Sequence, residues 1–119
     1  MEFEQFKSII DQYPLKILYD SSCAKEYQYV NPEVCRFLIV KFSKLPNFIE
    51  VPYGFRYSKR KKHIVPIDRK HKAVSTYLAY KHITNPSEKV VHKELSRIIK
   101  NLKKSQFNLK LENIQKDFQ

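Results

Sequence analysis

The sequence predicts a single compact α+β domain that spans residues 1–119. Three observations favour this class. Helix-start patterns occur near both ends of the chain, short alternating apolar segments occupy its middle, and hydrophobic residues, 42% of the total, are spread throughout. A chain of this length can form one hydrophobic core. We therefore expect N-terminal helices, a small antiparallel β-hairpin or sheet, and a C-terminal helix pair.

The chain is expected to begin with a helix. Residues 2–12 place Phe3, Phe6 and Ile10 on one helical stripe. Residues 15–19 are apolar enough to be a candidate strand.

Two helix-start patterns follow. Residues 20–22 (Asp-Ser-Ser) offer side-chain oxygens that can cap a helix reaching about residue 29. Residues 31–33 (Asn-Pro-Glu) combine a capping residue, a proline where no amide donor is needed, and an acid in the first turn. We expect a helix over 34–45, although the apolar run 37–40 would also suit a buried strand.

The middle of the chain is expected to form β structure. A strand over residues 48–51 ends at the Pro-Tyr-Gly sequence of 52–54. Two further strands, 55–57 and 63–65, are joined by residues 58–62 (Ser-Lys-Arg-Lys-Lys). Four consecutive cations would be costly to bury, so this connection is predicted to be a solvated hairpin tip.

A helix pair is expected next. Asp68 can cap a helix that reaches about His82. Residues 85–88 (Asn-Pro-Ser-Glu) then combine a cap, a proline at the first helical position and a capping-box acid, which predicts a helix over about 86–104. Residues 107–114 alternate apolar and polar side chains and indicate a closing strand.

Positive charge is concentrated in one part of the chain. Residues 1–50 carry six Lys/Arg and seven Asp/Glu, residues 51–104 carry fifteen and three, and the whole chain has a net charge of +11. Such a block repels itself in a compact state, so a polyanionic partner is expected. Nucleic acid is the most abundant polyanion, and much of its affinity for basic proteins comes from phosphate neutralisation.

The helix predicted over 86–104 has one basic and one apolar face. At about 100° per residue its cations fall within an arc of about 80°, and these are Lys89, Lys93, Arg97, Lys100 and Lys104. The apolar residues lie nearly opposite: Val91, Leu95, Ile98, Ile99 and Leu102. Neighbouring cations on a helix repel one another, so helix stability does not explain the stripe. A phosphate-facing surface does, and a solvated lysine-rich face is the alternative.

Two more basic elements complete the predicted nucleic-acid surface. The first is the hairpin tip with a neighbouring arginine, namely Arg56, Lys59, Arg60, Lys61 and Lys62. The second is a cluster that follows the second hairpin strand, namely Arg69, Lys70 and Lys72. Cations at these positions suit phosphate contacts, which position a protein without reading sequence. Double-stranded DNA is the favoured partner, with RNA the less favoured form of nucleic acid.

The hairpin and the helix pair together resemble a winged-helix protein. A basic hairpin tip is similar to a wing that lies along a DNA backbone, and the helix pair is similar to a helix-turn-helix whose second helix enters a major groove. The order differs, because this hairpin precedes the helix pair whereas a wing usually follows it. The turn at residues 83–85 also lacks glycine. The binding inference therefore rests on charge.

Aromatic residues beside the basic tip keep a second substrate class open. Tyr53, Phe55 and Tyr57 share one face of an ideal strand and could stack unpaired bases of single-stranded DNA or RNA. The simpler interpretation is that this face packs into the core.

An enzyme interpretation depends on three residues. Asp68, Arg69 and Lys70 follow an apolar run and are similar to the D-x-K element of metal-dependent nucleases, in which the acid binds Mg²⁺ and the lysine supports the attacking water or the scissile phosphate. Such sites need further acids, of which Glu33 or Glu50 would supply only part. We therefore predict no catalytic residue, and a small nuclease stays an alternative. A viral or plasmid-encoded accessory protein whose basic face binds an acidic protein surface is another.

The remaining residues indicate neither a metal nor a cofactor. The four histidines lack zinc-ligand spacing, and Cys23 and Cys35 form neither a C-x-x-C pair nor a disulfide framework. No apolar run approaches the roughly 18–20 residues that span a bilayer, and the first residues lack a signal-peptide pattern. We expect a cytoplasmic protein with no membrane partner, for which a dimer is compatible with the sequence.

Overall fold

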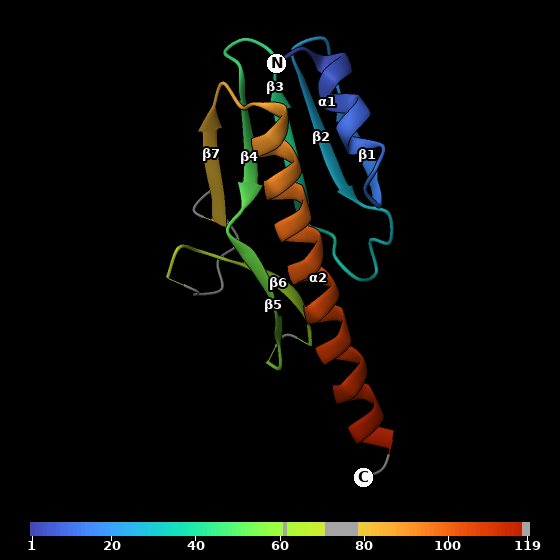
Figure 1. Ribbon diagram of the computed structural model, residues 1–119. Helices are drawn as coiled ribbons and strands as arrows, with labels where there is room; N and C mark the ends of the chain where they lie inside the picture. The colour runs from blue at the N-terminus through green and yellow to red at the C-terminus, as the bar shows by residue number, and fades with distance from the viewer. Residues whose placement is uncertain (61, 71–78, 118–119) are drawn as a thin grey trace.

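The computed structural model describes residues 1–60, 62–70 and 79–117, with side chains described as far as Leu111. Within these residues the chain forms two helices and two antiparallel sheets (Figure 1). One sheet has five strands in the order β1-β2-β3-β4-β7, and the other is the β5-β6 hairpin. The long helix α2 crosses one face of the larger sheet and continues past the hairpin (Figure 1). The predicted α+β class is confirmed.

Helix α1 (Phe3–Ile10) confirms the predicted N-terminal helix. The backbone N–H of Glu2 donates to Gln5 Oε1 at 2.9 Å and so satisfies one of the amide groups at the helix start. The apolar stripe of the helix is buried against the larger sheet through Phe6, Ile9 and Ile10.

The five-stranded sheet is antiparallel throughout and receives both helices on the same face. Its strands are β1 (Leu15–Asp20), β2 (Ala24–Tyr29), β3 (Leu38–Ser43), β4 (Phe48–Pro52) and β7 (Tyr80–Thr84). Alternate residues of the central strands form a core with α2. The strands supply Tyr27, Val40, Phe42, Ile49 and Val51, and α2 supplies Val91 and Leu95. The strands predicted over 15–19 and 48–51 are therefore confirmed.

Strands β2 and β3 replace the two helices predicted after residue 20, so both helix predictions are wrong. The capping side chains close turns instead. Ser21 Oγ accepts hydrogen bonds from the backbone N–H of Cys23 at 3.3 Å and of Ala24 at 3.0 Å, which turns the chain from β1 into β2. Asn31 Oδ1 accepts the backbone N–H of Glu33 at 3.1 Å in a turn that ends before β3. In β3 the buried-strand alternative for residues 37–40 is the one that forms.

Strands β5 (Gly54–Ser58) and β6 (His63–Ile67) confirm the predicted hairpin. They pair with Gly54 opposite Ile67 and Ser58 opposite His63. The hairpin packs against α2 in a second core cluster, in which Phe55 and Ile64 meet Ile98 and Leu102.

The predicted C-terminal helix pair is wrong. Residues 80–84, placed at the end of its first helix and in the following turn, form β7 and pair along their whole length with β4. Residues 71–78 of that predicted helix lie outside the described residues. Among the described residues after β7 there is a single long helix, so the winged-helix resemblance fails as well.

Helix α2 (Glu88–Asp117) confirms the helix predicted over 86–104 and extends it. It continues through residues 107–114, where the predicted closing strand is wrong. No proline or glycine occurs in residues 88–117, so nothing in the chain ends the helix early. No helix in the described ranges is both long and apolar enough to cross a membrane.

The start of α2 differs in detail from the prediction. Ser87 rather than Asn85 caps the helix, because the backbone N–H of Val90 donates to Ser87 Oγ at 3.2 Å. Asn85 has a φ of 47°, in the left-handed region that asparagine tolerates, and its backbone N–H donates to the Asn47 carbonyl at 2.9 Å. The turn between β7 and α2 therefore needs no glycine.

Candidate functional site

Three of the described cationic side chains lie at the hairpin tip and are exposed to solvent. Lys59, Arg60 and Lys62 are exposed, and Lys61 lies outside the described residues. The backbone of Lys62 has a φ of 59°, and its N–H donates to the Ser58 carbonyl at 2.7 Å. The tip therefore reverses the chain within a tight turn and carries its cations at the end of the hairpin.

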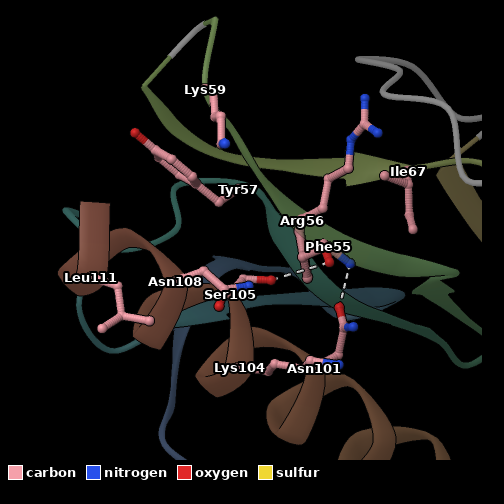
Figure 2. A pocket seen from close by; sticks show the side chains of 10 residues that line it. All are labelled: Phe55, Arg56, Tyr57, Lys59, Ile67, Asn101, Lys104, Ser105, Asn108 and Leu111. Carbon is pink, nitrogen blue, oxygen red and sulfur yellow. Dashed lines mark hydrogen bonds between the residues drawn. The ribbon is translucent and has the colours of Figure 1, made fainter. Parts of the chain in front are cut away.

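A groove of about 560 Å³ lies between the hairpin and the C-terminal half of α2 (Figure 2). Three of its lining residues are cations, Arg56 and Lys59 from the hairpin and Lys104 from α2. The other lining residues that the structure describes carry no acid, and they are Phe55, Tyr57, Ile67, Asn101, Ser105, Asn108 and Leu111. The groove thus combines parts of two predicted basic elements.

Two polar side chains of α2 fix the helix against the hairpin (Figure 2). Asn101 Oδ1 accepts the backbone N–H of Phe55, and Ser105 Oγ donates to the Phe55 carbonyl at 3.2 Å. Pro66 lies opposite Phe55 in the hairpin and has no N–H to donate. Side chains of α2 therefore complete the hydrogen bonding of β5 and hold Lys104 at the same groove as Arg56.

Four of the five cations in the predicted α2 stripe are exposed, namely Lys89, Lys93, Lys100 and Lys104. At 1.5 Å per residue the stripe from Lys89 to Lys104 is about 22 Å long. Because Lys104 also lines the groove, the stripe and the hairpin surface meet near this point.

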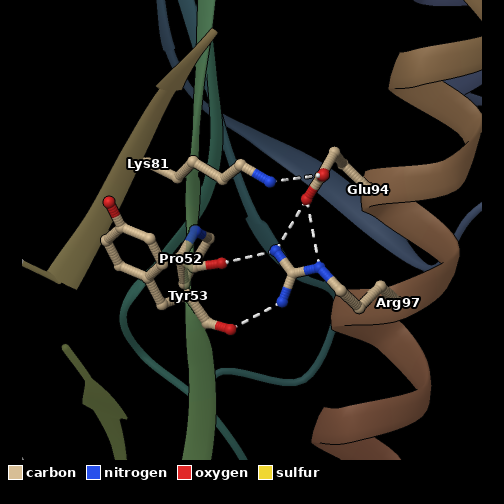
Figure 3. A network of polar contacts seen from close by, with 5 residues as sticks. All are labelled: Pro52, Tyr53, Lys81, Glu94 and Arg97. Carbon is tan, nitrogen blue, oxygen red and sulfur yellow. Dashed lines mark hydrogen bonds and ion pairs between the residues drawn. The ribbon is translucent and has the colours of Figure 1, made fainter. Parts of the chain in front are cut away.

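Arg97, the fifth cation, has a different position (Figure 3). Its guanidinium donates to the backbone carbonyls of Pro52 at 2.8 Å and Tyr53 at 2.6 Å. It also donates to the Glu94 carboxylate at 2.7 and 3.1 Å. These bonds tie α2 to the segment between β4 and β5, so Arg97 differs from the four exposed cations of the stripe.

Glu94 is the centre of this network, with a side chain only 7% exposed. Lys81 Nζ from β7 donates to its second carboxylate oxygen at 2.9 Å. Burial alone would raise the pKa of Glu94, but the hydrogen bonds and charges of Arg97 and Lys81 outweigh it and lower that pKa. Glu94 is therefore ionised at neutral pH and acts as an anchor between α2, β4 and β7.

The D-x-K residues adopt a turn after β6. Asp68 Oδ1 accepts the backbone N–H of Lys70 at 2.8 Å, and the side chains of Arg69 and Lys70 are exposed. No group of three or more His, Cys, Asp or Glu side chains is placed to hold a metal ion within the described part of the chain. Arg69 and Lys70 add exposed positive charge, whereas Lys72 lies outside the described residues.

The three aromatic residues beside the tip do not share one environment. Phe55 is 2% exposed and belongs to the core, while Tyr53 and Tyr57 are half-buried. The core interpretation therefore holds for the central ring. Only Tyr57 and Phe55 of the three line the groove.

Neither cysteine is part of a disulfide. Cys23 is exposed and Cys35 is buried, and burial raises the pKa of the Cys35 thiol to about 11. This thiol is therefore protonated at neutral pH and is a poor nucleophile.

Sequence reasoning missed the polar residues that shape the groove. Asn101, Ser105 and Asn108 recur at intervals of four and three residues along α2, so they share a helical face between the basic stripe and the apolar face. This spacing indicates that polar groups of another element lie along this side of the helix.

Comparison of the chain with known protein families, with curated proteins and with solved structures finds no match. The possible functions are therefore distinguished by the charge and the shape of the surface.

Proposed function

We propose that the protein binds nucleic acid through its phosphates, with double-stranded DNA as the favoured form. The groove supports this proposal most directly. Arg56 and Lys59 lie almost fifty residues before Lys104, yet all three line one cavity, and no acid is among the lining residues that the structure describes. Cations gathered in this way repel one another, and a bound polyanion offsets that repulsion.

The surface around the groove extends the same chemistry. The α2 stripe adds Lys89, Lys93 and Lys100 along about 22 Å, at 1.5 Å per residue. Duplex DNA presents one negative charge per roughly 1.7 Å of helix axis, so a stripe of this length faces several phosphates. The exposed tip residues Arg60 and Lys62 add a second point of contact.

Phosphate contacts of this kind position a protein but do not select a sequence. We therefore propose binding that depends strongly on salt and weakly on base sequence. The cations Lys61 and Lys72 remain sequence-based predictions for the same surface.

The first prediction concerns the groove. Replacing Arg56, Lys59 and Lys104 by Gln removes three exposed cations and leaves the buried core unchanged. Affinity for a duplex should fall about a hundredfold at ~0.15 M salt, because three phosphates are no longer neutralised. Fluorescence anisotropy with a labelled duplex, the matching single strand and an RNA of the same length measures this effect.

A charge-matched control separates the groove from net charge. Replacing Lys7, Arg36 and Lys44 by Gln removes the same charge from exposed positions before residue 50. This variant should keep nearly the affinity of the wild type. Equal reductions of affinity in the two variants would show that the groove is not the binding site, and wild-type protein that binds none of the three nucleic acids would favour an acidic protein partner.

A further inference from the structure

The groove between the β5-β6 hairpin and α2 has walls that a phosphate does not use. Besides its cations it is lined by aromatic and apolar side chains, among them Tyr57 and Leu111, and by the side-chain amides of Asn101 and Asn108. Cations are sufficient to bind a phosphate, and an aromatic ring and a leucine add nothing to that contact. A nucleic-acid base matches this lining, because it has a flat face that stacks and edges that form hydrogen bonds. The groove therefore has contacts for a whole nucleotide.

The packing of α2 brings Tyr57 close to Leu111. Phe55 bonds to the helix through both of its backbone groups, its N–H to Asn101 and its C=O to Ser105, so β5 and α2 run in the same direction. Tyr57 lies two residues further along the strand, which is about 6.8 Å, and a helix covers that distance in roughly four to five residues. Tyr57 from the hairpin and Leu111 from the helix therefore line the same end of the groove (Figure 2).

The side chains at this end of the groove have binding groups that the fold does not use. Tyr57 is half-buried, and no other aromatic ring and no cation of the described residues stacks on it. Leu111 is 42% exposed. The side chain of Asn108 makes no hydrogen bond within the described part of the chain, and Asn101 uses only its oxygen, which accepts the Phe55 N–H. An aromatic ring, an apolar side chain and amide groups are thus available to a ligand.

We propose that this groove holds an unpaired nucleotide of the bound nucleic acid, with its base between Tyr57 and Leu111 and its phosphate at Lys104. The inference rests on the proposed function and names the form of nucleic acid, a duplex that continues into a single-stranded extension. The cavity of about 560 Å³ lies within the roughly 300–1,000 Å³ of pockets that enclose small molecules, the size class of a nucleotide. A base inside a duplex is paired and stacked, so its face does not reach a protein side chain.

The basic stripe of α2 leads to this point. Lys89, Lys93 and Lys100 are exposed and precede Lys104, which also lines the groove. The stripe is about 22 Å long at 1.5 Å per residue, and this length matches about six base pairs at roughly 3.4 Å each. A duplex that lies along the stripe therefore reaches the groove at one end, where an unpaired strand can enter. Stacking accepts any base, so this contact keeps the weak dependence on sequence.

Three ligands that share one labelled duplex test the inference. The first is the blunt duplex, the second adds a single-stranded extension of three nucleotides, and the third adds the same extension with abasic nucleotides. Extensions are made at the 3′ end in one set and at the 5′ end in another. The second and third ligands carry equal numbers of phosphates, so the difference between them reports the bases alone. Fluorescence anisotropy should show about tenfold tighter binding of the extension with bases in at least one set, because stacking of one base is worth roughly that factor.

Variants of the groove locate the base. Tyr57→Ala should remove the preference for the extension with bases and leave affinity for the blunt duplex within about twofold, whereas Tyr57→Phe keeps the ring and should keep the preference. Leu111→Ala changes an exposed position of the opposite wall and should reduce the preference by itself. Tyr19→Ala removes an exposed tyrosine of β1 and is the matched control that should change nothing. Circular dichroism should show that all four variants fold.

The outcomes separate this inference from the proposed function. If the wild type binds the extensions with and without bases equally in both sets, the inference is overturned, and salt-dependent binding of the blunt duplex would then still support phosphate binding. A preference that survives Tyr57→Ala as well as it survives Tyr19→Ala would overturn the placement of the base. Wild-type protein that binds none of the three ligands would overturn both proposals.

Discussion

At the scale of single residues, charge and position together decide what a cation does. A helical wheel places Arg97 and Lys100 in one basic stripe, yet Arg97 binds two backbone carbonyls and Glu94, while Lys100 is exposed. An arginine can satisfy several acceptors at once with its planar group, which suits an anchoring position. The wheel cannot separate these roles, because the carbonyls of Pro52 and Tyr53 come from a distant part of the chain.

The Glu94 network predicts a pH-dependent contribution to stability. Glu94→Gln should lower the free energy of unfolding by about 1–3 kcal/mol at pH 7, because Arg97 and Lys81 no longer have a charged acceptor. The folded-state pKa of Glu94 is lowered from its ordinary value of 4.5, so the stabilisation is complete above that value and is lost as the pH falls through the lowered pKa. The difference between wild type and variant should therefore shrink in acid, as urea unfolding at pH 7 and pH 3 would measure.

A second glutamate of the same helix provides the control. Glu88 is exposed in the first turn of α2, and Glu88→Gln should cost only a few tenths of a kcal/mol through the helix dipole. A Glu94→Gln effect no larger than that of the control, or one that grows in acid, would contradict the anchoring role.

At the scale of elements, local signals predict those parts of the fold that depend on local interactions. The helix from Ser87 and the β5-β6 hairpin follow from caps, turn residues and apolar spacing. The predictions fail where a residue can form either of two local structures, a helix cap or a turn. Ser21 and Asn31 can cap helices, but here they close turns, and the strands that follow them are stabilised by their neighbours in the sheet.

Long-range pairing explains the other failures of the element predictions. Strand β7 exists through its partner β4, from which more than twenty-five residues separate it. The alternation in residues 107–114 is equally readable as a helix whose Leu109 side chain is half-buried. Neither strand β7 nor the helix over residues 107–114 can be predicted from a short stretch of the sequence alone.

The packing of α2 on β5 is testable at this scale. Asn101→Ala and Ser105→Ala each leave a backbone group of Phe55 without its partner, which should cost about 1–3 kcal/mol of unfolding free energy per substitution. The double variant should also bind duplex DNA more weakly, because Lys104 is no longer held at the groove. Chemical denaturation and anisotropy measure the two effects.

Asn108 supplies the matched substitution for this test. It lines the same groove and is exposed, and its side chain makes no hydrogen bond to any residue in the described ranges. Asn108→Ala should therefore leave the unfolding free energy within about 0.5 kcal/mol of the wild type. If Asn101→Ala is as harmless as Asn108→Ala, then α2 is held against the hairpin by apolar packing alone.

At the scale of the whole molecule, the sequence divides the chain into two parts with different charge. The first fifty residues supply α1, β1 to β3 and most of β4, with nearly balanced charge, and the basic half supplies the hairpin and α2. The excess of cations is readable from composition. The convergence of Arg56, Lys59 and Lys104 is not, because it depends on how α2 packs against the β5-β6 hairpin, a contact between distant parts of the chain.

The salt dependence of duplex binding tests the central proposal most directly. For the wild type, the logarithm of the binding constant should fall linearly with the logarithm of the salt concentration, with a slope set by the number of phosphates that the protein neutralises. Replacing Arg56, Lys59 and Lys104 by Gln should make that slope shallower by about 2.7, at roughly 0.9 for each phosphate that is no longer neutralised. Replacing Lys7, Arg36 and Lys44 by Gln should leave it unchanged. A slope near zero for the wild type, or equal slopes for the two variants, would contradict phosphate binding at this groove.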